Sequence, residues 1–302
     1  MKKYKTIAVT GITGHTGKYF AQELIKNNYK GNVKCLVRES SNTRILDNSN
    51  IHFEKIVGDI NDEKAINELL SNADILVHIV NIHYSLQLVK AAKDNKVNRI
   101  ILVHTTGIYS KHKQASEEYK KIERNLEKYI NDKNLSITIL QPTMIYGDIC
   151  DHNISKFIKI ADKLPVIPEI NRGKALIQPV NARDLGKAYY QCAIKNKLPS
   201  THYVVSGKDV ITIHELMENI CSKLGKKAHF INISPKIAES MAKIIKFISF
   251  KKIDLVEKVQ RLSEDRTYSN KKSRIDFNYN PESFNKGLER EIKQYRECKN
   301  EK

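Results

Sequence analysis

The chain has 302 residues, of which 40% are hydrophobic and 28% charged, with 12 glycines and 7 prolines. This composition is typical of a globular protein with a sizeable core, and it excludes collagen-like, repeat and disordered classes. The 52 Lys and Arg residues outnumber the 34 Asp and Glu residues, which gives a net charge of +18. Because the lysines are spread along the whole chain without an aromatic-basic platform or a helix-turn-helix motif, we expect no nucleic-acid binding.

Neither a transmembrane segment nor a signal peptide is predicted. The apolar stretch 237–250 is shorter than the roughly 20 residues that span a bilayer, and it contains Glu239, Lys243 and Lys246. The N-terminal sequence Met1-Lys2-Lys3 leads directly into an apolar strand, which leaves no room for a cleavable segment. The sequence therefore predicts a cytoplasmic location.

The first 150 residues alternate short β-rich runs with amphipathic helical stretches. Runs rich in Val, Ile and Leu predict buried strands at 4–10, 33–37, 51–57, 75–80, 100–104 and 136–140. Apolar residues at steps of three and four predict helices at 15–27, 62–71, 84–95 and 117–131. This alternation is typical of an α/β fold with a doubly wound parallel sheet, the Rossmann fold.

After Gly147 the pattern becomes less regular, which predicts a smaller C-terminal α/β lobe. Helices are expected at 154–163, 182–195 and 212–224, a strand at 203–206, and a proline-containing loop at 165–168. The remainder is expected to be helical, and the chain from Asn270 onward to be a solvated end with its aromatic residues tucked down. Those aromatic residues are Phe277, Tyr279 and Phe284.

One predicted helix in this lobe is both basic and strongly apolar on one face. The apolar face consists of Ile237, Met241, Ile244, Ile245 and Ile248. We expect it to pack on its own domain or on a second subunit, and the alternative is a membrane surface.

The most informative segment is the turn from the first strand into the first helix, Gly11-Ile12-Thr13-Gly14-His15-Thr16-Gly17. Gly11 permits a tight turn, Gly14 lets the backbone approach a pyrophosphate, and Gly17 allows the helix to pack closely on the strand. The helix N-terminus adds free N–H groups and a positive dipole. The segment predicts a dinucleotide site, so we divide the chain into an NAD(P)-binding domain at 1–150 and a mostly helical substrate lobe, interleaved with it, at 151–302.

The end of the second strand indicates which dinucleotide binds. Arg38 stands about twenty residues after the glycine loop, where an acidic residue would bind the ribose 2′-hydroxyl of NAD. A guanidinium instead pairs with a 2′-phosphate, although Glu39 would oppose this if it pointed inward. We therefore expect NADP, with NAD as the alternative.

Glycines spaced three and three resemble those of extended and atypical short-chain dehydrogenase/reductases, which include the NAD-dependent epimerase/dehydratase family and NmrA-like NAD(P)-binding proteins. Gly58-Asp59 looks like the adenine-contacting turn of these proteins, 74–81 resembles their fourth strand, and 140–147 resembles the segment along the nicotinamide. The resemblance suggests a homodimer. It also implies a set of cofactor-binding residues, namely Gly11, Thr13, Gly14, His15, Thr16, Gly17, Arg38, Asp59, Ile60, Ile79, Val80, Asn81, Pro142 and Thr143.

Such enzymes usually act with a Ser or Thr, a Tyr, and a Lys four residues after the Tyr. By this resemblance Thr105 and Tyr119 are the expected catalytic residues, whereas Glu123 stands in the Lys position. A carboxylate there would raise the pKa of the tyrosine. Thr106 is the alternative to Thr105. The alternatives to the missing lysine are Lys120, Lys121 and the separate pair of Tyr109 and Lys113, which has the same spacing. No metal site is expected, because no group of His, Cys, Asp or Glu has the spacing of metal ligands.

These features predict an NAD(P)-dependent oxidoreductase or epimerase that transfers a hydride on a hydroxyl or carbonyl substrate. A nucleotide-sugar is one substrate class that the resemblance implies, and Arg172, Lys174 and Arg183 would suit its diphosphate. The alternative is a catalytically weak NADP(H)-sensing or assembly protein similar to NmrA-like members. Glu123, and Gln141 in place of the usual Arg, favour that alternative.

Overall fold

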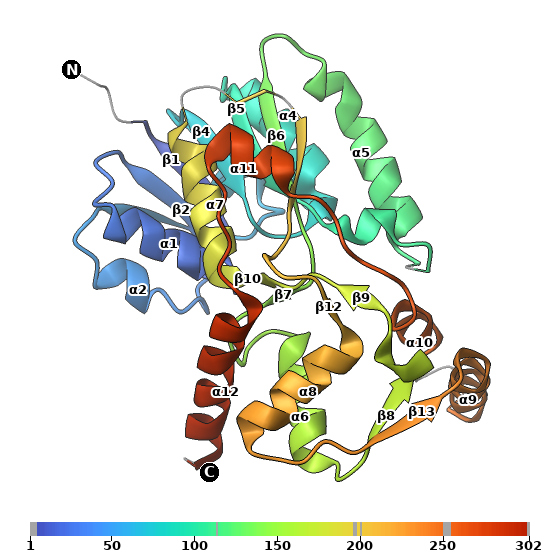
Figure 1. Ribbon diagram of the computed structural model, residues 1–302. Coiled ribbons are helices and arrows are strands. Elements are labelled where there is room, and N and C mark those ends of the chain that lie inside the picture. Colours follow the sequence, from blue (N-terminus) through green and yellow to red (C-terminus); the bar gives the residue numbers. More distant parts are fainter. Residues whose placement is uncertain (1–4, 113, 196–197, 200, 250–254, 301–302) are drawn as a thin grey trace.

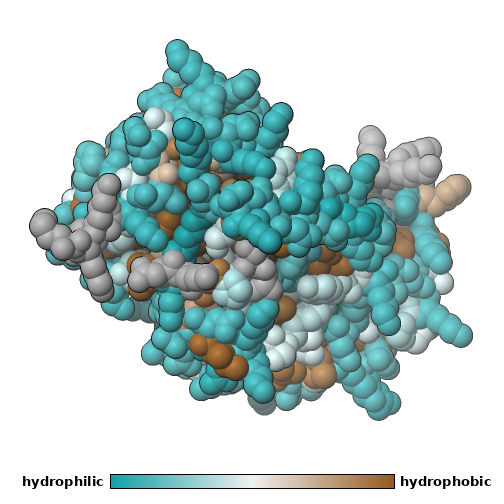
Figure 2. Space-filling model, turned by 90° about the horizontal axis from the view of Figure 1, so that it is seen from above, coloured by the Kyte–Doolittle hydropathy of each residue, from teal (hydrophilic) through white to brown (hydrophobic). Residues whose placement is uncertain are grey.

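The computed structural model describes residues 5–112, 114–195, 198–199, 201–249 and 255–300. Tyr4, at the start of the first expected strand, and Lys113, of the alternative catalytic pair, lie outside these described residues. The face shown in Figure 2 is largely hydrophilic, with apolar side chains in small scattered groups. No helix in the described part of the chain has both the length and the apolar character needed to cross a bilayer.

A seven-stranded sheet lies at the centre of the large domain, in the order β11-β6-β5-β4-β1-β2-β3 (Figure 1). Every neighbouring pair is parallel. The expected doubly wound Rossmann sheet is therefore confirmed, with its order reversing between β1 and β4. The strands are β1 Ile7–Thr10, β2 Val33–Val37, β3 Phe53–Val57, β4 Ile75–His78, β5 Arg99–Val103, β6 Ser136–Pro142 and β11 Thr201–Val205.

Two layers of helices cover the sheet, so its central strands are buried on both faces. Every residue of β1, β2, β4 and β5 is buried, which explains why these strands read as continuous apolar runs rather than alternating ones. One layer holds α1 Gly17–Lys26, α7 Ala182–Ile194 and α11 Lys271–Phe277, and the other holds α3 Glu63–Leu70, α4 Ser85–Asp94 and α5 Ser116–Ile130. A short helix, α2 Arg44–Asp47, packs beside α1.

Gly186 lets α7 lie unusually close to α1. A Cβ atom at this position would come 2.5 Å from the backbone carbonyl carbon of Tyr19. The ring of Tyr189, one turn further along α7, meets Phe20 edge to face with the ring centroids 6.2 Å apart. This pair of helices holds the N-terminal end of α1, and with it the glycine loop, against the sheet.

The smaller lobe is built from helices and three two-stranded sheets. Its helices are α6 Ile154–Lys163, α8 Ile213–Leu224, α9 Pro235–Ile248, α10 Val256–Arg261 and α12 Phe284–Asn300. Its strands pair as β7 Ile145–Tyr146 with β10 Val180–Asn181, β9 Leu176–Ile177 with β12 Ile211–Thr212, and β8 Ile167–Ile170 with β13 Phe230–Ile233. Single turns of 3₁₀ helix occur at η1 Ile82–Tyr84, η2 Thr106–Tyr109 and η3 Asn171–Gly173.

Two expectations for this lobe are wrong. Pro165 lies in a bend, as expected, but Pro168 lies in strand β8. Proline lacks an N–H, and because β8 pairs with β13 alone, the missing donor can face away from the ladder. The part expected to be helical throughout contains β13. Four-residue strands of this kind are too short for a periodic signal to separate them from loops.

The chain returns to the large domain after residue 150. β11 forms the edge of the main sheet, α7 packs on its face, and Phe277 and Tyr279 are buried in the same core cluster. Segments after residue 150 thus belong to both the large domain and the smaller lobe. Residue 150 marks only where the chain first leaves the main sheet. The expected burial of Phe277, Tyr279 and Phe284 is confirmed. The expected solvated end is wrong, because α12 packs on α8 and buries Leu288, Glu291 and Ile292.

The apolar face of α9 does not pack on its own domain. Ile237 is 57% exposed and Ile248 68%, and Met241, Ile244 and Ile245 are exposed as well. The helix rests on the lobe through Ala238 and Ala242. The expectation of packing within the domain is therefore wrong, whereas packing on a second subunit stays a prediction.

Candidate functional site

A cavity of about 290 Å³ opens at the carboxyl edge of the sheet, where the strand order reverses between β1 and β4. Ligands of doubly wound proteins bind at this place, because the helices on either side diverge there. The lining residues are Thr10, Gly11, Thr13, Gly14, Leu36, Arg38, Ser41, Gly58, Asp59, Ile60, Ile79, Val80 and Tyr84. The cavity thus brings together eight of the expected cofactor residues, namely Gly11, Thr13, Gly14, Arg38, Asp59, Ile60, Ile79 and Val80.

The three glycines of the loop meet different requirements. Gly11 has a φ of +82° and approaches Val80, so a side chain there would be strained. A Cβ atom at Gly17 would overlap the carbonyl oxygen of Gly11, because the helix starts directly against the turn. At Gly14 a Cβ atom would meet only the same oxygen, at 3.2 Å. The fold therefore needs Gly11 and Gly17, whereas Gly14 leaves space that a phosphate group fits.

The end of the cavity beside β2 and β3 has one cation and one fixed carboxylate. Arg38 is exposed and lines the cavity, while Glu39 does not line it. Asp59 accepts hydrogen bonds from the backbone N and the Nδ2 of Asn61, at 2.9 and 2.8 Å. These hydrogen bonds hold the pKa of Asp59 below its ordinary value, so its carboxylate stays charged. An exposed guanidinium at this corner suits a 2′-phosphate.

Several expected cofactor residues lie outside this cavity. His15 is turned to Asp148, with 3.4 Å between its Nε2 and Oδ2, and the hydroxyl of Thr16 accepts a hydrogen bond from Tyr189. Asn81 caps η1 by accepting from the backbone N of His83 at 3.1 Å. Gly17 and Pro142 are not among the lining residues either, and Thr143 lines a second cavity.

A buried histidine ties the first strand to the end of the fourth. The Nε2 of His78 lies 2.9 Å from the carbonyl oxygen of Asn81, which can only accept, so this nitrogen carries the proton and Nδ1 accepts from the hydroxyl of Thr10 at 2.7 Å. Burial lowers the pKa of His78 to about 4, so the ring is neutral under ordinary conditions. The histidine thereby fixes the backbone on both sides of the reversal point.

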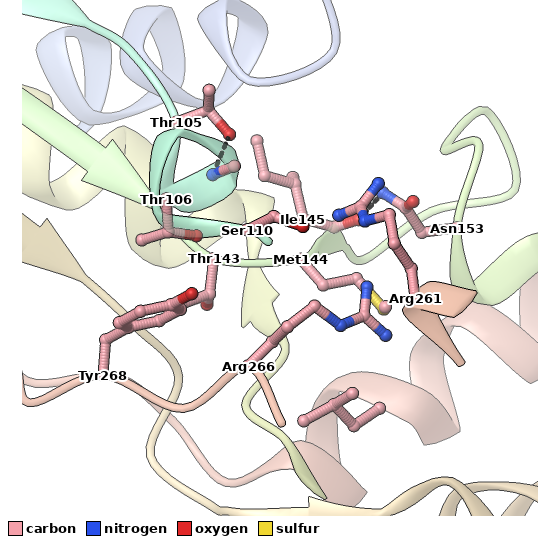
Figure 3. A pocket seen from close by; sticks show the side chains of 12 residues that line it. Thr105, Thr106, Ser110, Thr143, Met144, Ile145, Asn153, Arg261, Arg266 and Tyr268 are labelled. Carbon is pink, nitrogen blue, oxygen red and sulfur yellow. Dashed lines mark hydrogen bonds between the residues drawn. The ribbon is translucent and has the colours of Figure 1, made fainter. Parts of the chain in front are cut away.

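A second cavity, of about 250 Å³, lies at the same carboxyl edge beyond β5 and β6 (Figure 3). Thr105, the expected catalytic threonine, lines it, and its hydroxyl accepts a hydrogen bond from the backbone N of Gly107 at 3.0 Å. The other lining residues are Thr106, Gly107, Ser110, Thr143, Met144, Ile145, Asn153, Ile177, Arg261, Arg266 and Tyr268.

Tyr119, the expected proton donor, lines neither cavity. It is half-buried on α5, and its ring faces His83 with the centroids 5.7 Å apart. Burial and the neighbouring carboxylates of Glu118 and Glu257 raise its pKa above the ordinary value. Its catalytic role stays a prediction.

Glu123, in the position where a lysine is usual, belongs to a partly buried polar cluster instead. Its Oε1 accepts from Nδ1 of His104 at 2.9 Å and from Nε2 of Gln141 at 3.0 Å, and its Oε2 lies 3.2 Å from Nε2 of His202. Although burial opposes ionisation, these histidines lower the pKa of Glu123 to about 2. The carboxylate therefore links α5 to strands β5, β6 and β11.

The cationic side chains at the second cavity differ from those expected. Arg183 donates to the carbonyl oxygen of Gly147 at 2.8 Å, and neither Arg172 nor Lys174 lines the cavity. Arg261 and Arg266, which sequence reasoning missed, line it. They lie at and just after the short helix α10, in a segment with no periodicity that would have placed them at the sheet edge.

A doubly wound sheet with a glycine loop at its reversal point and a cavity beside it defines a dinucleotide-binding protein of the Rossmann class. The model of the NmrA-like family matches residues 3–292. The chain belongs to the NmrA-like family.

Three curated proteins illustrate the range of its relatives. UDP-glucose 4-epimerase of Vibrio cholerae is 22% identical over 264 residues, which cover 74% of this chain and 77% of the epimerase. The mitochondrial NADH dehydrogenase [ubiquinone] 1 alpha subcomplex subunit 9 of Arabidopsis thaliana is 23% identical, over 78% of this chain and 61% of that protein. Sterol-4-alpha-carboxylate 3-dehydrogenase, decarboxylating, of Dictyostelium discoideum is 32% identical over 74 residues, only 24% of this chain and 21% of the dehydrogenase.

Solved structures share the fold over nearly the whole chain. The crystal structure of gox2253 has a TM-score of 0.78 at 17% identity, and covers 98% of this chain and 99% of that one. UDP-glucuronic acid 4-epimerase from Bacillus cereus, solved with UDP-glucuronic acid and NAD, has a TM-score of 0.74 at 18% identity. The match covers 97% of this chain and 99% of the epimerase chain. At these identities the likeness establishes the Rossmann-like α/β fold.

Proposed function

We propose that this protein is an NADP(H)-dependent oxidoreductase that acts on a carbonyl or hydroxyl group. One observation carries the proposal: the cavity at the glycine loop and the cavity at Thr105 both open at the carboxyl edge of one sheet. The first has the glycine cradle and the arginine that suit a phosphorylated dinucleotide. The UDP-glucuronic acid 4-epimerase from Bacillus cereus, which shares the fold, is solved with NAD. The second offers a hydroxyl and a phenol to a substrate.

The residues of the second cavity can perform the polar part of such a reaction. When bound, the dinucleotide supplies or accepts a hydride. The hydroxyl of Thr105 would donate a hydrogen bond to the substrate oxygen. Tyr268 lines the cavity with Thr105, and burial and the Glu264 carboxylate raise its pKa, so the phenol stays protonated at neutral pH and can donate its proton to that oxygen. Geometry therefore favours Tyr268 over Tyr119 as the donor.

The cofactor preference can be tested at Arg38. Arg38→Gln is expected to weaken NADPH binding by about tenfold or more and to leave NADH binding within about twofold, because only NADPH has the 2′-phosphate that a guanidinium pairs with. The measurement is titration of both nucleotides by native mass spectrometry and nucleotide fluorescence. Arg44→Gln, on the neighbouring helix α2, is the matched control. Equal losses for both nucleotides would contradict the NADP preference.

Turnover would be tested with a panel of carbonyl and hydroxyl substrates. Thr105→Val is expected to lower kcat by about 100-fold, and Tyr268→Phe by a similar factor, because each removes a donor to the reacting oxygen. Tyr119→Phe is expected to change kcat by less than about threefold. A large loss at Tyr119 with none at Tyr268 would assign the proton donor to Tyr119, as the sequence predicts.

A second candidate function is NADP(H) sensing or assembly with little or no turnover. The observation that favours it is Glu123, a carboxylate in the position where a lysine that would lower the pKa of Tyr119 is usual. The mitochondrial relative is named as a subunit of a larger complex. The discriminating result is NADPH binding that changes the association of this chain with partner proteins while no substrate in the panel is turned over.

A further inference from the structure

We propose that the second cavity takes a small anionic substrate, whose carboxylate or phosphate group is held by Arg261 and Arg266. This inference rests on the proposed function and specifies its substrate. In the view of Figure 3, both arginine side chains extend into the cavity, on the side away from Thr105 and Tyr268. An anionic group placed there would lie across the cavity from the hydroxyl and the phenol that serve the reacting oxygen.

The charges at the cavity need an anion. The Nε of Arg261 and the Nε of Arg266 are both without exposed surface and without a hydrogen-bond partner among the described residues. Arg261 has one carboxylate nearby, Glu257, whose Oε1 lies 3.8 Å from its Nη1. No ion pair is found for Arg266 in the described part of the chain. Burial and the positive charge of Arg261 lower the pKa of Arg266, so the two guanidinium groups repel each other, and an anion between them would reduce that repulsion.

The carboxylates close to this cavity accept hydrogen bonds from other groups, and the charge of Glu264 also favours the charged form of Arg266. Glu264 accepts hydrogen bonds from the hydroxyl of Ser110 at 2.6 Å and from the backbone N of Lys111 at 2.7 Å. Asp265 accepts from the backbone N of Leu176 at 2.8 Å. The residues that line the cavity include no Asp and no Glu. The cavity is therefore cationic, with hydroxyl and amide side chains as its other polar groups.

The size of the cavity limits the substrate. Its volume is about 250 Å³, and the two arginines lie across it from Thr105. Because the arginines and Thr105 line the same small space, the anionic group would lie only a few atoms from the reacting carbon. These dimensions favour a short oxo- or hydroxy-acid, or a small sugar phosphate, over a nucleotide-sugar.

The test uses the full chain with saturating NADPH, so that the phosphate sites of the dinucleotide cavity are occupied. Oxalate represents a carboxylate substrate and inorganic phosphate a phosphorylated one, with UDP-glucose as the bulky comparison. Binding is measured by isothermal titration for the unchanged chain and for Arg266→Gln, Arg261→Gln and the control Arg172→Gln, which alters an arginine of the same lobe outside the cavity. NADPH affinity is measured separately for each variant.

We expect oxalate or phosphate to bind, Arg266→Gln and Arg261→Gln each to weaken that binding at least tenfold, and Arg172→Gln to leave it unchanged. Melting temperature should not fall in Arg266→Gln, because the variant removes repulsion between the two arginines. Anion binding that is indifferent to both cavity variants, tighter binding of UDP-glucose than of either small anion, or binding of none of the three would overturn the proposal. If the unchanged chain did not bind NADPH, the proposed function would be overturned instead.

Discussion

Replacing Gly14 with leucine is expected to abolish dinucleotide binding while leaving the fold intact. A Cβ atom at this position meets only the carbonyl oxygen of Gly11, at 3.2 Å, but the rest of the side chain would occupy the cavity where the pyrophosphate is expected. We expect at least a 100-fold loss of NADPH affinity, which corresponds to about 2.7 kcal/mol. Nucleotide titration and the melting temperature of the free protein are the measurements.

Gly17→Ala is the matched comparison in the same loop. Its added methyl group would overlap the carbonyl oxygen of Gly11, so the free protein should unfold at a markedly lower temperature, which Gly14→Leu should not do. The contrast separates the glycine that the ligand requires from the glycine that the fold requires. Undiminished NADPH affinity in Gly14→Leu would contradict the assignment of this cavity to the cofactor.

Glu291→Gln is expected to stabilise the protein, and increasingly so as pH rises. Glu291 is fully buried on α12, accepts a hydrogen bond from the backbone N of Gly147 at 3.0 Å, and lies beside the carboxylate of Asp151. Burial and the negative charge of Asp151 raise the pKa of Glu291 to about 10. The folded protein therefore holds this carboxyl protonated at neutral pH, and glutamine is close to that form in shape and hydrogen bonding.

The direction of the effect follows from the proton balance. Between the ordinary pKa of a glutamate and about 10, the folded state binds a proton that the unfolded state has released, so the free energy of unfolding falls as pH rises. At most about 1.4 kcal/mol is lost per pH unit, or about 2 to 3 kcal/mol between pH 7 and pH 9. His78 contributes little between pH 7 and pH 9, since its ring is neutral in the folded state and mostly neutral in the unfolded chain.

Urea unfolding at pH 7 and pH 9 measures this difference for the two proteins. Between pH 7 and pH 9 the free energy of unfolding should fall further in the unchanged chain than in Glu291→Gln. Comparing the two proteins cancels the titration of thiols and amines, which is common to both. If the difference in free energy of unfolding between the two proteins stays constant from pH 7 to pH 9, Glu291 is ionised in the folded state and the prediction is wrong.

The cofactor half of the site could be predicted from the sequence because its signals are local. Gly11, Gly14 and Gly17 fall within seven residues, between a buried strand and an amphipathic helix, so their spacing alone indicates a turn that approaches a phosphate. Arg38 follows from counting to the end of the next strand. Parallel strands bring these ends to one edge whatever the lengths of the intervening helices.

The substrate half could not be predicted, because it is assembled from distant segments. Arg261 and Arg266 come more than 150 residues after Thr105, and no periodicity aligns them with it. The role of Glu123 depends on His202, which only the edge strand β11 brings beside α5. His15 and Thr16 were assigned to the cofactor from their place in the loop, but Asp148 and Tyr189, more than 130 residues away, engage their side chains.

The position of β11 at the edge of the sheet has a consequence for how the chain folds during synthesis. Until residues 201–205 have left the ribosome, the backbone N–H and C=O groups along one side of β6 have no partner. The core between α1 and α7 stays incomplete for longer still, until Phe277 and Tyr279 are made. Folding of the large domain is therefore a late event in translation, governed by contacts of high sequence separation, and the nascent chain needs protection from aggregation while most of it is already synthesised.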